Sequence, residues 1–172
     1  PQKKPKVAYF TEMMQHPALD KEMADAFVKY LTLLKESGTE VQAIDFPLMD
    51  YIVPAYYVLT TAEASSNLSR YDGVKYGYAA KDNYADIHDF YKQTRSKGFG
   101  KEVQRRIMLG TFVLSAGYYD AYFTKAQQVR KILFDFTAQV FKNADIIISP
   151  TVPSPAFKFG EKSNDPIEMF LA

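Results

Sequence analysis

The spacing of apolar residues separates three predicted strands from longer helical segments. Apolar runs of strand length lie at residues 6–10, 40–45 and 145–149. Between the first two runs, residues 19–37 carry apolar side chains at helical spacing, with Asp20 as a candidate N-cap and Gly38 where a left-handed residue ends a helix. A strand, a helix and a strand in this order form a βαβ unit, for which parallel pairing is the default.

The middle of the chain is predicted to be helical, with one glycine-containing loop. Pro54 fits the first turn of a helix that continues to Asn67. Residues 71–78 contain two glycines among tyrosines and are expected to form a structured loop. Further helices are expected at 84–96, 101–116 and 119–143. The predicted fold class is α/β, with a short parallel or mixed sheet covered by several long helices in a single domain over 1–172.

Composition narrows the class of protein. The chain has 172 residues, of which 47% are hydrophobic, as is typical of a globular protein. No apolar run reaches the roughly 20 residues of a membrane span. The 21 basic and 20 acidic residues are nearly balanced, whereas a protein that grips nucleic acid unaided carries a basic excess. The absence of Cys excludes disulfides and thiolate chemistry and fits a cytoplasmic protein.

Most of the candidate chemical groups favour a structural interpretation. His16 and His88 lie far apart without ligand spacing, so no metal site is predicted. Ser65 and Ser66 are candidate nucleophiles, but no base is placed beside them, and small residues at a helix contact are the favoured interpretation. Glu63, between alanines and serines, is expected to be buried and hydrogen-bonded.

Arg106 is the most informative charged residue. On a helix it shares a row with Gly110, Val113 and Gly117, which places a guanidinium at the end of a small-residue groove. Such a group can hold a carboxylate through two parallel hydrogen bonds. The alternative is a structural ion pair with an Asp or Glu, and the row alone favours that alternative.

Five stretches of the chain carry a resemblance to a known family. They are Pro-Ala-Tyr-Tyr at 54–57, Ala-Glu-Ala-Ser-Ser-Asn-Leu-Ser-Arg-Tyr-Asp-Gly-Val-Lys-Tyr-Gly at 62–77, Gly-Phe-Gly-Lys-Glu-Val-Gln-Arg-Arg-Ile-Met-Leu-Gly at 98–110, Ser-Ala-Gly-Tyr-Tyr-Asp-Ala-Tyr at 115–122 and Ser-Pro-Thr-Val-Pro-Ser-Pro-Ala-Phe at 149–157. The sequence resembles the amidase-signature family, and within it the A subunits of glutamyl-tRNA(Gln) amidotransferases. The resemblance implies a partial amidase-signature fold and a C-terminal fragment of such a protein.

The resemblance also implies an activity and partners for the parent protein. Proteins of this kind hydrolyse glutamine and pass the ammonia to a B subunit, which uses ATP and Mg²⁺ to amidate Glu-tRNA(Gln) in a complex with a C subunit. Their Ser–cis-Ser–Lys machinery lies upstream of the matched region. We therefore expect no catalytic residue and no cofactor in this chain, and no activity of the fragment alone.

Substrate binding is what the resemblance carries over to these residues. The family holds the amino-acid end of glutamine with a tyrosine, an arginine and an aspartate. The first two fall on Tyr56 and Arg106, and the aspartate would follow 165–172 at about the next position. This correspondence favours the carboxylate clamp at Arg106. Two alternatives stay open, a fragment of a stand-alone amidase acting on another amide and a non-catalytic interaction module. We also expect the isolated fragment to self-associate.

Overall fold

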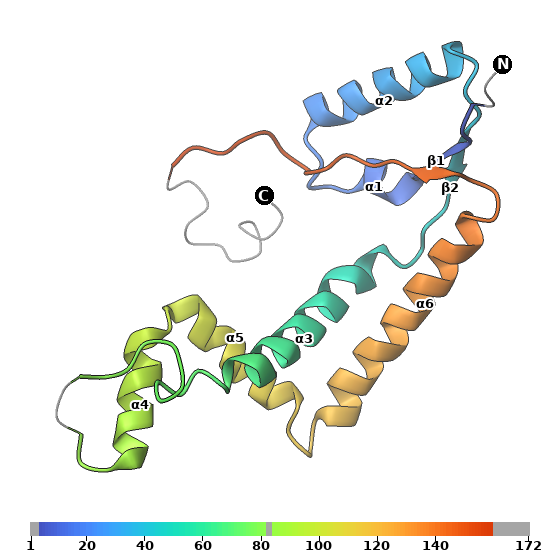
Figure 1. Ribbon diagram of the computed structural model, residues 1–172. Helices are drawn as coiled ribbons and strands as arrows, with labels where there is room; N and C mark the ends of the chain where they lie inside the picture. The colour runs from blue at the N-terminus through green and yellow to red at the C-terminus, as the bar shows by residue number, and fades with distance from the viewer. Residues whose placement is uncertain (1–3, 82–83, 160–172) are drawn as a thin grey trace. The chain divides into compact units, whose positions relative to one another are not determined.

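The computed structural model describes residues 4–81 and 84–159, which fall into two compact units. The first unit joins Pro1–Met49 to Phe134–Ala172, and the second is Asp50–Leu133. The elements in chain order are β1 (Val7–Phe10), α1 (Thr11–Gln15), α2 (Lys21–Glu36), β2 (Val41–Ile44), α3 (Met49–Leu68), α4 (Ile87–Gly98), α5 (Lys101–Val113), a π-helical turn (Asp120–Thr124), α6 (Lys125–Val140) and β3 (Ile146–Ile147) (Figure 1). The prediction of a single domain stays a prediction. Among the described helices, none is long and apolar enough to cross a membrane.

The first unit is built on a three-stranded parallel sheet of order β2-β1-β3. Val7 of β1 lies opposite Val41 on one side and Ile146 on the other, which confirms the predicted parallel βαβ pairing. The third strand has two residues, whereas the sequence predicted 145–149. Its pairing with β1 ends at Ala8, although β1 continues to Phe10.

Helix α2 has the boundaries that its capping residues predict. The Asp20 side chain accepts a hydrogen bond from the Glu22 backbone N–H at 2.8 Å, which satisfies one of the unpaired donors of the first turn. Gly38, just beyond the last turn, adopts a φ of 78° that a side chain would disfavour. The helix buries Leu31 within its first unit.

Aromatic packing forms much of the core of the first unit. The rings of Phe10 and Phe46 stack with centroids 4.5 Å apart, and Phe136 lies 5.2 Å from Phe46. Phe10 and Phe46 are almost fully buried, so they supply strong hydrophobic stabilisation at the end of β1.

In the second unit, α3 begins earlier than the sequence predicted. Pro54 was expected in the first turn, but the helix begins at Met49 and Pro54 lies inside it. A proline there has no N–H to donate to the carbonyl one turn earlier, that of Asp50. The prediction failed because proline marks a helix start only by statistical preference, while the apolar residues at 51–53 extend the helix backwards.

The segment between α3 and α4 is a structured loop, as predicted. Asp72 accepts hydrogen bonds from the backbone N–H groups of Val74 and Lys75, at 2.9 and 3.3 Å. Gly73 and Gly77 both have positive φ, which explains the two glycines of this loop.

Helix α4 begins three residues later than the predicted 84–96 and ends two residues later. The Asp86 side chain accepts from the Asp89 N–H at 2.8 Å and so sets the N-terminus at Ile87. Its last residue is Gly98.

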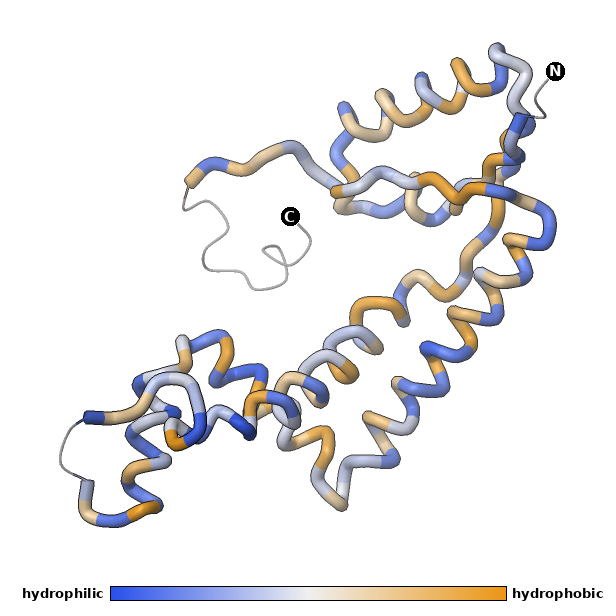
Figure 2. The backbone as a smooth tube through the Cα atoms, in the orientation of Figure 1, coloured by the Kyte–Doolittle hydropathy of each residue, from blue (hydrophilic) through white to orange (hydrophobic). Residues whose placement is uncertain are grey.

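The last long predicted helix begins with a π-helical turn and continues as an α-helix. The predicted helix at 119–143 consists of the π-helical turn followed by α6. Steps of four and three between apolar residues fit both geometries over one turn, so periodicity did not reveal the π-helical turn. Polar and apolar segments alternate along α6 (Figure 2). Ala126 and Val140 are buried, whereas Tyr122 is 44% exposed.

Candidate functional site

Helices α3 and α5 approach closely at a single glycine. A Cβ atom at Gly110 would overlap the backbone carbonyl of Thr61 and lie 2.6 Å from the Cβ of Ser65. Gly110 and Val113 are buried, so this part of the row below Arg106 is a contact surface, whereas Gly117 lies beyond the end of α5 and is exposed. The occupant of the predicted groove is therefore α3.

Hydroxyl groups reinforce this helix contact. Ser65 Oγ lies 3.0 Å from Thr111 Oγ1 across the contact, and within α3 the fully buried Thr61 donates to the carbonyl of Tyr57 at 2.6 Å. The interpretation of Ser65 as a residue of a helix contact is confirmed. The expected burial of Glu63 was wrong: it is exposed and accepts from Asn67 Nδ2 at 3.4 Å. It lies about 200° around the helix from Thr61, away from the contact.

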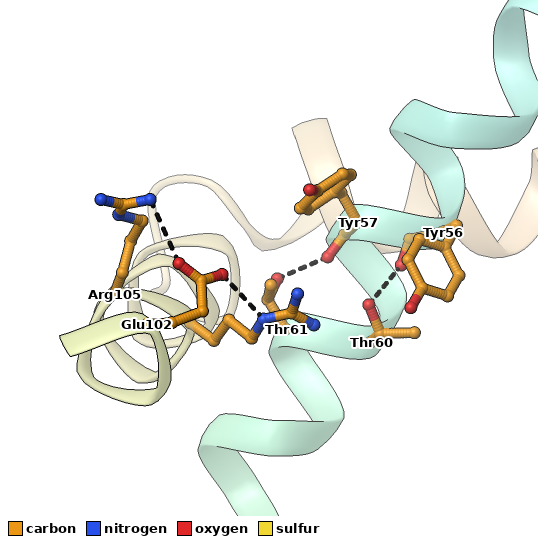
Figure 3. Close-up of polar contacts among 7 residues, drawn as sticks. Tyr56, Tyr57, Thr60, Thr61, Glu102 and Arg105 are labelled. Atoms are coloured by element: carbon orange, nitrogen blue, oxygen red, sulfur yellow. Dashed lines mark hydrogen bonds and ion pairs between the residues drawn. The ribbon is translucent and has the colours of Figure 1, made fainter. Parts of the chain in front are cut away.

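Tyr56 is positioned by the helical turn that follows Pro54. Its ring meets that of Tyr57 edge to face, with centroids 5.9 Å apart. Its carbonyl accepts a hydrogen bond from Thr60 Oγ1 at 2.7 Å, and Figure 3 shows these residues on α3. Tyr56 is 40% exposed.

Arg106 forms an ion pair within its own helix. Its Nε lies 3.0 Å from Oε1 of Glu102, one turn earlier on α5. The other oxygen of Glu102 accepts from Arg105 Nη1 at 3.1 Å, as the dashed line in Figure 3 shows. The structural ion pair that the sequence left open is therefore present. Sequence reasoning did not name Glu102, although a Glu four residues before an Arg is the spacing at which such pairs form on a helix.

The ionisation of Arg106 connects the two helices. The hydrogen bond with Glu102 raises the pKa of the guanidinium, burial opposes that rise, and the Tyr56 side chain on α3 raises the pKa further. Tyr56 and Arg106, which the sequence singled out separately, thus lie on two helices that pack together, near enough for the tyrosine to affect the pKa of the arginine. Their role in substrate binding stays a prediction, and the aspartate expected after 165–172 lies outside the described residues.

This arrangement can bind an anion. A guanidinium carries five N–H donors, which is more than the contacts with Glu102 and Tyr56 use. Because Glu102 takes Nε, a ligand carboxylate would meet the end of the group formed by the two terminal nitrogens. That end offers two parallel N–H bonds to a carboxylate. The Arg106 side chain is 35% exposed, so a ligand can reach it.

Comparison with known proteins identifies relatives over nearly the whole chain. The family described as Amidase matches residues 1–172. The A subunit of the glutamyl-tRNA(Gln) amidotransferase of Clostridium botulinum (strain Loch Maree / Type A3) is 53% identical over 154 residues, which make up 90% of this chain and 32% of the relative. The protein of the same name from Pelagibacter ubique (strain HTCC1062) is 51% identical over 153 residues, or 89% of this chain and 31% of the relative. The chain thus spans about a third of the length of these curated relatives.

Solved structures have the same fold. The crystal structure of the glutamyl-tRNA(Gln) amidotransferase A subunit from Thermotoga maritima matches with a TM-score of 0.64 and 37% identity, over 97% of this chain and 31% of that one. A crystal structure of an amidase matches with a TM-score of 0.65 over 93% of this chain and 31% of that one, and at 19% identity it supports the fold alone. The α/β fold class and the resemblance seen in the sequence motifs are confirmed. With a family match that covers all 172 residues, the chain belongs to the amidase family.

Proposed function

We propose that this chain is part of the A subunit of a glutamyl-tRNA(Gln) amidotransferase and forms one wall of its glutamine site. The proposal is supported by relatives of that name that are more than 50% identical over about nine-tenths of this chain. The parent protein hydrolyses glutamine, and its ammonia is used to convert Glu-tRNA(Gln) to Gln-tRNA(Gln). It works in the cytoplasm with B and C subunits. The B subunit uses ATP and Mg²⁺.

The observation that carries the proposal is the partly exposed guanidinium of Arg106 on α5, on a helix that packs against the helix of Tyr56, whose side chain raises the pKa of that guanidinium. Free glutamine has an α-carboxylate that is not changed by amide hydrolysis. A planar guanidinium fits such a carboxylate with two hydrogen bonds, and a phenol can accept from the arginine while it donates to a ligand oxygen. The pair therefore recognises the amino-acid end of the substrate.

We assign no nucleophile to this chain. The hydroxyl of Ser65 is paired with Thr111 in the helix contact, which is a packing role. Amide cleavage in the parent protein then depends on groups outside these 172 residues. The isolated chain is accordingly inactive as a glutaminase, and its contribution is to binding and orientation of the substrate.

Kinetics of the full-length protein in its complex test the proposal. Arg106→Lys keeps the charge but loses the planar fork, so the KM for glutamine should rise about tenfold or more, while kcat changes by less than about threefold. Tyr56→Phe should raise KM by a smaller factor, about threefold, because one hydrogen bond to the carboxylate is lost. An unchanged KM in both variants would remove these residues from the glutamine site.

A further inference from the structure

Glu102 holds two arginines at once, in the first turn of α5. Its Oε1 accepts from Nε of Arg106 at 3.0 Å, and its Oε2 accepts from Nη1 of Arg105 at 3.1 Å. Each oxygen of the carboxylate therefore has its own guanidinium partner. Figure 3 shows Glu102 on α5 between Arg105 and the residues of α3.

The charges of this trio leave a cationic excess for a ligand. Two guanidinium groups contribute +2 and the single carboxylate contributes −1, so the net charge is +1. A one-to-one pair between Glu102 and Arg106 would neutralise the clamp. Because Glu102 is shared with Arg105, Arg106 keeps part of its attraction for a second carboxylate.

Glu102 occupies one nitrogen of Arg106, and this determines which side of the guanidinium is left for a ligand. A guanidinium can bind a carboxylate through Nε and one terminal nitrogen, or through its two terminal nitrogens. In this structure Nε is taken by Glu102. An arginine side chain held at Nε loses much of its rotational freedom before the ligand arrives, and such preorganisation favours binding.

We propose that Glu102 is a positioning residue for the glutamine site, one that holds Arg106 at Nε so that the two terminal nitrogens grip the substrate carboxylate. This inference rests on the proposed function of Arg106. Glu102 itself does not touch the substrate. Its side chain is 55% exposed, and exposed ion pairs contribute little to stability, so removal of Glu102 should leave the fold intact.

The test uses the full-length protein in its complex, with steady-state glutaminase kinetics. Glu102→Ala should raise the KM for glutamine about five- to tenfold, with kcat changed by less than about twofold and a Tm shift below about 2 °C. Glu102→Gln keeps an acceptor of the same length without the charge, so its KM should lie between those of Glu102→Ala and the wild type. Glu22→Ala is the matched control, because Glu22 is also an exposed acidic residue at the second position of a helix.

A double-mutant cycle separates positioning from other effects. In the Arg106→Ala background, Glu102→Ala should cause no further rise in KM, because Glu102 acts through Arg106. An additive rise in the double variant would overturn the positioning role. A lower KM in Glu102→Ala would overturn it as well, since it would mean that Glu102 competes with the substrate for Arg106.

The same data distinguish the inference from the function on which it rests. If Arg106→Ala raises KM while Glu102→Ala leaves it unchanged, only the positioning role is wrong. If Arg106→Ala itself leaves KM unchanged, both the carboxylate clamp and the positioning role are overturned.

Discussion

The hydroxyl groups of Ser65 on α3 and Thr111 on α5 lie 3.0 Å apart, directly beside Gly110, where the two helices approach most tightly. This contact fixes α5 against α3 within the second unit. It therefore sets the distance between Tyr56, which α3 carries, and Arg106, which α5 carries one turn before Gly110. A glycine in a packing contact thus determines the geometry of the candidate site.

Replacement of Gly110 by alanine should destabilise the protein. Alanine is normally the better helix former, by about 1 kcal/mol, so an isolated helix would gain from the change. Here the added methyl group would overlap the Thr61 carbonyl and the Ser65 side chain, and we expect a net loss of about 1–3 kcal/mol in the free energy of unfolding. Denaturant unfolding of the wild type and the variant measures this difference.

Gly117→Ala is the matched control for that experiment. A Cβ atom at Gly117 would meet no described atom within 4 Å. Its free energy of unfolding should stay within about 0.5 kcal/mol of the wild-type value. Equal effects of the two substitutions would show that the close approach at Gly110 is unimportant for stability.

The elements that were predicted well are those with local signals. Asp20 and Gly38 mark the two ends of α2 by capping chemistry, which acts within a few residues and can be read from sequence. The parallel sheet followed from the order of strand, helix and strand. Pro54 misled the prediction of where α3 begins, because its position inside the helix depends on residues before it that also pack.

The candidate site was predictable only in part. Arg106 stood out because it continues a row that contains Gly110, and Tyr56 was added by resemblance to a family. Neither observation showed that α3 and α5 pack against each other, which is what brings the two residues into one region. The choice between an ion pair and a ligand clamp also needed coordinates, which place Glu102 on Nε and leave the terminal nitrogens at an accessible edge.

Loss of the Arg95 side chain should loosen the loop that follows α3. Its Nη1 donates to the carbonyls of Leu68 and Tyr71 at 2.9 and 3.2 Å, and its guanidinium lies 5.1 Å from the centre of the Phe99 ring. Arg95→Ala removes all three contacts, so amide hydrogen exchange at residues 72–80 should accelerate about tenfold or more. Mass spectrometry of deuterated peptides provides the measurement.

Arg70→Ala serves as the comparison for Arg95→Ala. Arg70 is an exposed residue at the start of the loop between α3 and α4, and its replacement changes the net charge by the same amount. Its exchange profile over the loop should match the wild type. Faster exchange in both variants would indicate a general charge effect rather than the contacts of Arg95.

The loop should also respond to acid through Asp72. Backbone hydrogen bonds from Val74 and Lys75 hold the pKa of this carboxyl below its ordinary value of 3.8. A lowered folded pKa stabilises the loop above the unfolded value, and this stabilisation is lost as the pH falls through the folded value. After correction for intrinsic rates, exchange in the loop should be constant from pH 7 to about 5 and rise below about pH 4.

Asp72→Asn provides the control for that pH profile. An asparagine side chain keeps an acceptor oxygen for the same two N–H groups but does not titrate in this range. Its profile should be flat where the wild-type profile rises. A wild-type profile without any change below about pH 4 would contradict the assigned role of Asp72.

The isolated 172-residue chain should self-associate. Several large apolar side chains are strongly exposed; they are Met108 at 73%, Phe134 at 66%, Val74 at 63% and Ile132 at 54%. Exposed apolar surface of this kind promotes association. Size-exclusion chromatography with light scattering should therefore give a mass above the 19.6 kDa of one chain, rising with concentration. A monomer with one sharp unfolding transition would contradict this prediction.

The central claim is that Arg106 binds the α-carboxylate of glutamine. The direct measurement compares kcat/KM of the full-length complex for glutamine and for its α-carboxamide, which lacks that charge. The wild type should prefer glutamine by about 10²-fold. Arg106→Ala should reduce this preference to within about threefold, because no guanidinium then binds the charged α-carboxylate. If Arg106→Ala keeps the wild-type preference, another group binds the carboxylate and the account is wrong.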